Sequence, residues 1–148
     1  MSLIAGVEII KIKRSVSSEE EPVQYYPRLP SNETIVAIYP PKATEYLYVH
    51  CCQTDYWKVV QGNLTCIILR NRQYQYIPLS GKDDFFLKIP PRVPHGAINL
   101  HEESAVLVNA IICHKKLDKL DSRRIKPPFP YDLEAALSSS NLITTDLK

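Results

Sequence analysis

Two histidines, each beside a turn, are the residues of this sequence best suited to chemistry. His50 begins a segment that reads His-Cys-Cys-Gln-Thr-Asp-Tyr-Trp-Lys and runs on to a turn at Gly62, and His95 ends the segment Ile-Pro-Pro-Arg-Val-Pro-His. An imidazole changes its charge near neutral pH and also ligates metals, so two of them in one cavity can exchange protons or hold an ion. The sequence therefore predicts a site where the fold brings these two segments together.

Three neighbours of the histidines could assist in such a site. Asp55, if it lies near His50, can hold the imidazole in one tautomer and raise its basicity. Arg92 can bind a phosphate through two parallel hydrogen bonds, and the ring of Tyr48 can stack against a base or a sugar. Each of these residues also has an ordinary structural alternative. These are a surface ion pair for Asp55, an exposed position in a corner for Arg92 and core packing for Tyr48.

Short apolar or alternating runs, separated by turns, predict the elements that position these side chains. Val, Ile and Tyr are frequent in the runs, and with 12 prolines and only 4 glycines the chain has no stretch that reads as a long helix. This pattern is typical of an all-β barrel or sandwich, here with a short C-terminal helical segment at residues 131–137. The predicted strands cover residues 7–13, 34–39, 45–52, 56–60, 64–69, 76–79, 85–89, 96–100 and 105–112.

Length and composition exclude several classes of protein. A chain of 148 residues with 45% hydrophobic and 23% charged residues is typical of one domain, which we divide into an N-terminal strand and arm (1–30), a barrel core (31–114) and a C-terminal extension (115–148). A net charge of +2 is too balanced for a dedicated nucleic-acid binder. No apolar run is typical of a membrane span or a signal peptide, and the four cysteines show no disulfide framework, so we expect a cytoplasmic protein.

The two histidine segments resemble the two signature motifs of the cupin superfamily. In the first, Asp55 precedes the hairpin glycine, Gly62, at the spacing of the motif, and in the second Pro90, His95 and Asn99 keep theirs. The phrase Ile-Pro-Pro-x-x-x-His-Gly is similar to the signature of the branch around dTDP-4-dehydrorhamnose 3,5-epimerase. The resemblance implies a cupin jelly-roll barrel (a double-stranded β-helix) with a nucleotide-sugar pocket in its mouth, no cofactor and a homodimeric assembly.

The same resemblance implies roles for individual residues. In the epimerases a histidine abstracts a proton next to a keto group, a lysine stabilises the enolate and a tyrosine returns the proton from the other face. His50 matches the base, with His95 beside it, whereas Asp55 stands at the position of the lysine and Val108 at that of the tyrosine. Candidates for the acidic partner of the base are Asp118, Asp121 and Asp132.

The resemblance implies that the protein binds a nucleotide sugar. The reaction it implies is epimerisation or isomerisation of a 4-keto sugar, for which this sequence has only part of the family's catalytic residues. The candidate catalytic residues are His50, His95 and Asp55. The predicted contacts to the ligand are Lys58, Tyr48, Gln53 and Arg92.

Two alternatives remain open. One is a non-catalytic carbohydrate-binding cupin that has lost its chemistry. The other is a metal-dependent cupin using His50, Cys52 and His95, because Cys52 takes the position of a second metal histidine in many cupins. Imidazole and thiolate ligands suit zinc or iron.

Overall fold

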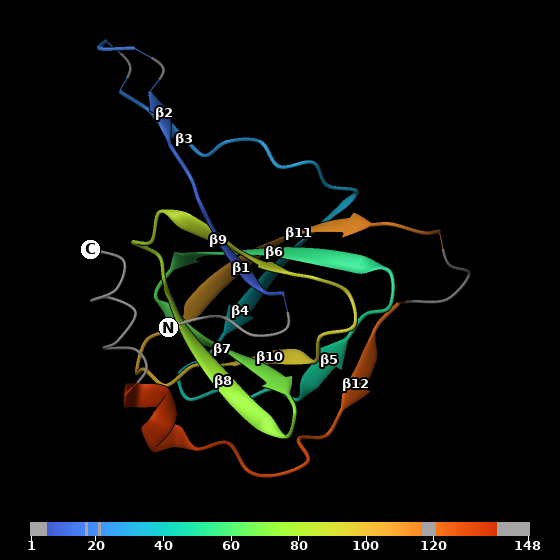
Figure 1. Cartoon of the computed structure of the whole chain (residues 1–148). Helices are drawn as coiled ribbons and strands as arrows, with labels where there is room; N and C mark the ends of the chain where they lie inside the picture. The colour runs from blue at the N-terminus through green and yellow to red at the C-terminus, as the bar shows by residue number, and fades with distance from the viewer. Residues whose placement is uncertain (1–5, 17, 21, 117–120, 139–148) are drawn as a thin grey trace.

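The computed structural model describes residues 6–16, 18–20, 22–116 and 121–138, and this part of the chain folds into two facing antiparallel β-sheets (Figure 1). The first sheet has the order β1 (Glu8–Lys11), β9 (Phe85–Ile89), β6 (Gln53–Gln61), β11 (Ala105–Cys113) and β4 (Glu33–Tyr39). The second has the order β12 (Arg123–Ile125), β5 (Leu47–Val49), β10 (His95–Ile98), β7 (Asn63–Arg70) and β8 (Gln73–Ser80). The predicted all-β class is confirmed.

The first hairpin of the barrel forms at the predicted turn. Gly62 joins β6 to β7 with a φ of 77°, and a Cβ there would lie 2.6 Å from the carbonyl oxygen of Ser104. Only glycine combines that backbone conformation with so close an approach. The next hairpin turns at Asn71 and Arg72, both with positive φ, as two-residue hairpin loops require. β7 runs to Arg70 and β8 begins at Gln73, so the hairpin is longer than the predicted strands over residues 64–69 and 76–79.

Strand alternation separates the core into two layers. Inside the barrel, side chains of both sheets form one apolar cluster that includes Leu87, Cys66 and Leu107. The outer face of the second sheet forms a smaller cluster around Ile67 and Tyr76, which the C-terminal segment covers. That segment contains a helix at residues 133–138, so the predicted C-terminal helix is confirmed within a residue or two.

Three parts of the chain differ from the predicted elements. The predicted strand over residues 45–52 forms a strand only at β5 (Leu47–Val49). The arm contains a short ribbon of β2 (Ser15–Val16) and β3 (Gln24–Tyr25) that extends away from the barrel (Figure 1). The strand β12 was not predicted. No helix among the described residues has the length and apolar character needed to cross a membrane.

Candidate functional site

His50, Asp55 and His95 meet inside the barrel. The Nε2 atom of His95 lies 3.1 Å from Oδ2 of Asp55, and the Nε2 atom of His50 lies 3.6 Å from the same oxygen. The two imidazole rings are 5.4 Å apart between centroids. Asp55 and His95 are buried, while the side chain of His50 keeps 12% of its surface exposed. His50 is therefore the member of this triad that a ligand can reach.

The pairing of β5 with β10 brings the histidines together. His95 begins β10 directly opposite Tyr48 of β5, and His50 follows β5 two residues after Tyr48, on the same face. Gly96 permits the pairing, because a Cβ there would lie 2.7 Å from the carbonyl oxygen of Tyr46. The glycine of the His-Gly signature thus has a structural reason, which is to let β5 approach the strand that carries His95.

The corner between β9 and β10 carries the chain from one sheet to the other. Arg92 lies in this corner with a φ of 68° and donates its backbone N–H to the carbonyl oxygen of His50 at 2.6 Å. This hydrogen bond ties the two motif segments to each other. The guanidinium of Arg92 is exposed, so the corner places a cation at the surface near the triad.

Both histidines are held through their Nδ1 atoms. Nδ1 of His95 lies 2.8 Å from the carbonyl oxygen of Val93, and Nδ1 of His50 lies 2.6 Å from that of Asp121. A carbonyl oxygen can only accept a hydrogen bond, so each Nδ1 carries a proton and donates it. Both Nε2 atoms then face the carboxylate of Asp55, and the contact at 3.1 Å is favourable when a proton lies between His95 and Asp55.

The carboxylate of Asp55 is fixed at both oxygens. Its Oδ2 faces the imidazoles, and its Oδ1 accepts a hydrogen bond of 2.7 Å from Nε2 of Gln53. Burial would raise the pKa of Asp55, but the hydrogen bond from His95, the attraction of the imidazoles when they are protonated and the amide of Gln53 together hold it below the ordinary value. Asp55 therefore stays ionised, and Gln53 supports it instead of lining a free surface.

The three candidate acidic partners of the base lie differently. Asp121 reaches His50 through its main-chain oxygen, while its carboxylate accepts hydrogen bonds from the backbone N–H groups of Cys51 and Cys52. Asp132 accepts a hydrogen bond from the N–H of Ala135 in the C-terminal segment. Asp118 lies outside the described residues. The carboxylate beside the histidines is that of Asp55.

Lys58, one of the predicted ligand contacts, lies on the other face of β6. It is 4% exposed, and its Nζ donates to the main-chain oxygen of Val59 and lies over the ring of Tyr26 at 5.6 Å. Burial lowers the pKa of this amine. The structure therefore does not bring Lys58 to the triad. Tyr48, in contrast, lies opposite His95 and is half-buried.

One rim residue gave no signal in the sequence. Arg124 of β12 lies opposite Tyr48, and its guanidinium carbon lies 4.2 Å from the centre of the Tyr46 ring. Residues directly opposite in an antiparallel pair share a face, so Arg124 stands on the same face as Tyr48 and His50. The sequence shows only an Arg-Arg pair in a proline-rich extension, and nothing in that pattern indicates which strand it joins.

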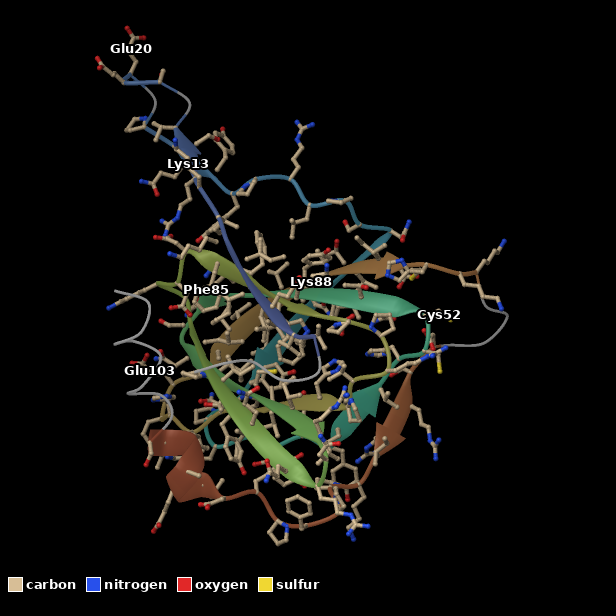
Figure 2. The ribbon with its side chains drawn as sticks, viewed as in Figure 1. Lys13, Glu20, Cys52, Phe85, Lys88 and Glu103 are labelled. Atoms are coloured by element: carbon tan, nitrogen blue, oxygen red, sulfur yellow. The ribbon has the colours of Figure 1, made fainter. Side chains whose placement is uncertain are left out.

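Among the described residues, the triad is also a group whose ligand atoms could hold a metal ion, since they all lie within 4.8 Å of one another. The group contains Asp55 where the metal hypothesis had Cys52. Cys52 directly precedes β6 (Figure 2), and its backbone N–H donates to the carboxylate of Asp121. Imidazole and carboxylate ligands suit zinc or iron as well as imidazole and thiolate do.

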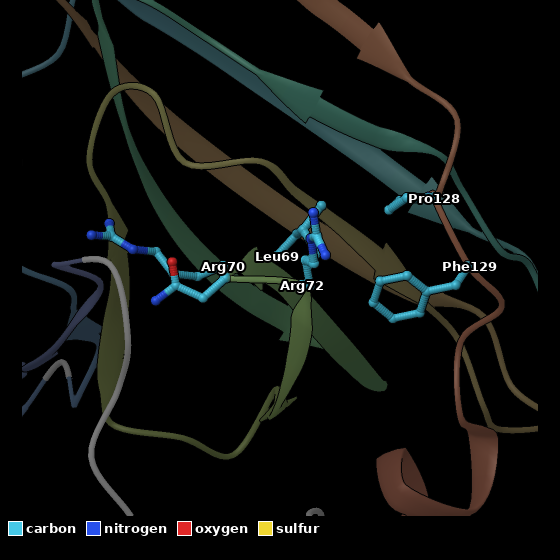
Figure 3. A pocket seen from close by; sticks show the side chains of 6 residues that line it. Leu69, Arg70, Arg72, Pro128 and Phe129 are labelled. Carbon is cyan, nitrogen blue, oxygen red and sulfur yellow. The ribbon is translucent and has the colours of Figure 1, made fainter.

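A pocket of about 570 Å³ lies outside the barrel, between the turn of the β7–β8 hairpin and the C-terminal segment (Figure 3). Arg70, Arg72 and Phe129 line it, together with Leu69, Asn71 and Pro128. None of the triad residues reaches it. The pocket lacks a side chain that could act as a base, and we do not assign the chemistry of the protein to it.

No protein-family model matches the chain, and no curated protein matches its sequence. Solved structures, in contrast, share its fold. A dTDP-sugar isomerase from Desulfovibrio desulfuricans has a TM-score of 0.69 at 18% identity, over 91% of this chain and 95% of that one. A sugar 3,4-ketoisomerase from Thermoanaerobacterium thermosaccharolyticum, in complex with TDP, has a TM-score of 0.66 at 15% identity, over 94% and 98%.

A dTDP-4-dehydrorhamnose 3,5-epimerase from Sulfolobus tokodaii has a TM-score of 0.65 at 15% identity, over 87% of this chain and 85% of that one. These likenesses confirm the predicted cupin jelly-roll barrel. The proteins that share this fold include the epimerases and sugar isomerases that the sequence resembled.

Proposed function

We propose that the protein binds a nucleotide-linked 4-keto sugar and moves a proton at a carbon next to the keto group, as an isomerase or epimerase. The observation that carries this proposal is the triad, in which the reachable Nε2 of His50 stands beside the carboxylate of Asp55 and the imidazole of His95. Solved structures of the same fold bind TDP and TDP-4-keto-6-deoxyglucose.

His50 is the base in this scheme. Its Nδ1 proton is held by the main-chain oxygen of Asp121, so Nε2 carries the lone pair that takes a proton from the sugar. The nearby carboxylate of Asp55 stabilises the imidazolium that forms. A histidine positioned in this way accelerates proton transfer by roughly 10²- to 10⁴-fold.

The oxygen of the enolate needs a hydrogen-bond donor, because charge that develops on it is costly in a buried site. Lys58 faces away from the triad. Tyr48, opposite His95, is the predicted ligand contact whose phenol stands on the same face as the base, and it takes that role in our scheme. Arg124 and Arg92, exposed near the triad, supply cations for the phosphates.

Deuterium incorporation tests the proposal. The protein is incubated in D₂O with TDP-4-keto-6-deoxyglucose, and proton NMR and mass spectrometry follow exchange at the carbons beside the keto group. Exchange in the wild type that is lost in the His50→Asn variant supports the proposal. If the sugar nucleotide raises the melting temperature but no exchange occurs, the protein is the non-catalytic binder instead.

Metal binding is a second candidate function, favoured by the way the triad is held. A metal-bound imidazole usually donates its other ring N–H to a carbonyl or carboxylate, as both histidines do here. The test is metal analysis of protein purified without chelators. Zinc or iron near one equivalent in the wild type, and its loss in the Asp55→Ala variant, would support a His50, Asp55 and His95 site. Sub-stoichiometric metal in the wild type would remove it.

The proposed assembly is a homodimer through the outer face of the first sheet. Val36 and Ile38 of the edge strand β4 are 62% and 69% exposed, and Val60 of β6 is 44% exposed. Apolar side chains clustered on a sheet face at an unpaired edge are typical of a contact surface. Light scattering tests this, because Ile38→Lys should convert a dimer to a folded monomer, whereas a monomeric wild type would contradict it.

The proposed location is the cytoplasm, where nucleotide sugars are made and thiols remain reduced. All four cysteines are unpaired, which agrees with a reducing compartment. Fractionation of the source cells, with an antibody against the protein, tests this location.

A further inference from the structure

Among the residues that the structure describes, two buried side-chain atoms inside the barrel have no hydrogen-bond partner. They are Nε1 of Trp57, on a side chain that is 4% exposed, and Oδ1 of Asn109. Buried polar groups in proteins are nearly always paired, and each exception needs an explanation. The indole N–H is a donor and the amide oxygen is an acceptor. A single group that can both accept and donate a hydrogen bond, such as a hydroxyl, would therefore satisfy both atoms.

The two residues stand directly opposite each other. Trp57 of β6 pairs with Asn109 of β11, two residues along both strands from the pair of Asp55 and Ile111. Because side chains alternate and opposite residues share a face, all four point into the barrel. The indole also meets the ring of His95 edge-on, with centroids 5.5 Å apart. The unpaired atoms therefore adjoin the triad.

The residues beside the unpaired atoms keep exposed surface at the sheet edge, although the atoms themselves are buried. Ile35 of β4 lies opposite Asn109 on the same face, yet 51% of its surface is exposed. Asn109 itself is only half-buried. The layer that covers the unpaired atoms is therefore thinnest at the edge formed by β4 and β11, where Ile35 and Asn109 keep exposed surface.

We propose that Trp57 and Asn109 form a subsite for a hydroxyl group of the sugar, which accepts a hydrogen bond from the indole N–H and donates one to the amide oxygen. A keto oxygen can only accept a hydrogen bond, so it could bond to the indole but not to the amide oxygen. A phosphate would be repelled, because its negative oxygens would face the oxygens of Asn109 and Asp55. The inference rests on the proposed function and deepens it. By fixing one hydroxyl, the pair would determine which carbon of the ring faces His50.

A second asparagine shows that this barrel can satisfy a buried amide where its role is structural. Asn99 is fully buried; its Nδ2 lies within 3.1 Å of three main-chain oxygens, and its Oδ1 accepts from the N–H of His101. Asn109 has the same side chain in the same barrel, but its oxygen has no partner. The contrast gives a matched pair of variants.

The test compares Asn109→Leu with Asn99→Leu by thermal unfolding and by calorimetric titration with TDP-4-keto-6-deoxyglucose and with TDP. Removing an unpaired acceptor leaves the stability of the free protein unchanged or higher, whereas removing a bonded one lowers it. We expect Asn109→Leu to keep or raise the melting temperature. The variant should bind the sugar nucleotide roughly tenfold more weakly than the wild type does and should bind TDP with unchanged affinity. Asn99→Leu should lower the melting temperature. Trp57→Phe should also weaken only the sugar nucleotide.

Three outcomes would overturn the subsite. If Asn109→Leu and Trp57→Phe bind the sugar nucleotide as tightly as the wild type does, the subsite is wrong while the proposed function stands. If Asn109→Leu lowers the melting temperature as Asn99→Leu does, Asn109 is a structural residue. If the wild type itself fails to bind the sugar nucleotide, the proposed function falls and the subsite falls with it.

Discussion

The two ends of the barrel interior are built on the same strands but carry different side chains. Along β6 the inward residues are Asp55, then Trp57, then Val59, so one strand passes from a carboxylate to an aliphatic side chain in about 13 Å. Around Val59 the interior is filled by apolar groups such as Leu107, which lies directly opposite it on β11. Around Asp55 it contains ionisable groups and unpaired polar atoms.

The comparison indicates that one end of the interior stabilises the fold and the other end serves function. The apolar end stabilises the fold by burying side chains away from water. The polar end stabilises the fold less, because its unpaired hydrogen-bonding groups cost free energy and the burial of its carboxylate is offset only by the hydrogen bonds from His95 and Gln53. A protein keeps such groups when they serve a ligand, which is why we place function at one end and stability at the other.

The largest effect should come from the base. His50→Asn should reduce proton exchange at the sugar by about 10³-fold, since Asn cannot accept the proton and a general base contributes roughly 10²- to 10⁴-fold. The melting temperature should change little, because the side chain is at the open end. The assay is deuterium incorporation, with His101→Asn as the matched control. Exchange that persists in His50→Asn would break the assignment of chemistry to this end.

A change at the apolar end should affect stability instead. Leu107 is 3% exposed, and its strand neighbours are Ala37 and Val59. Leu107→Ala should lower the free energy of unfolding by about 2–5 kcal/mol, through lost burial and the cavity left behind. Urea denaturation measures this change. A loss below about 1 kcal/mol, or a variant that folds normally but no longer binds the ligand, would blur the division between the two ends.

The carboxylate at the polar end should make stability depend on pH. Because the pKa of folded Asp55 lies below its ordinary value of 3.8, the ionised group contributes stability above that pH and loses the contribution as pH falls through the folded pKa. The difference in unfolding free energy between the wild type and Asp55→Asn should therefore be largest near about pH 5 and shrink below about pH 4. If this difference in unfolding free energy grew as the pH was lowered, the pKa of folded Asp55 would be raised instead of lowered, and the assignment of an ionised Asp55 would be wrong.

The smallest effect should lie at the rim. Arg124→Ala should lower the affinity for TDP by about threefold to tenfold at low salt and by less at high salt. Salt should reduce the effect because it screens the attraction between an exposed cation and a phosphate. Arg123→Ala is the matched control, since Arg123 precedes it on β12 and points to the other face. Equal losses in the two variants would mean that only net charge matters.

The sequence predicted the strands of the barrel with the exception of β12. Apolar alternation and turn residues were enough for β4, β7, β9 and β11, which pair with neighbours over most of their length. The strand β12 is three residues long and pairs with residues more than 70 positions away. A short segment of that kind has no periodicity of its own, so only the folded structure reveals it.

The candidate site was predictable in its residue types but not in its partners. The motif spacing singled out His50, His95 and Asp55, and the structure brings them together. Lys58 illustrates the limit, because its position on a strand was clear while the layer that buries it came from the distant arm. Trp57 could be predicted to point inward, but its unpaired N–H depends on the register with β11.

Nitrogen-15 NMR of histidine-labelled protein tests the central claim most directly, which is that a 4-keto sugar nucleotide binds against the imidazoles inside the barrel. His50, His95, His101 and His114 give four sets of ring signals in one spectrum. On saturation with TDP-4-keto-6-deoxyglucose we expect the Nε2 signals of His50 and His95 to shift while those of His101 stay in place. Saturated binding that leaves His50 and His95 unmoved would contradict the account.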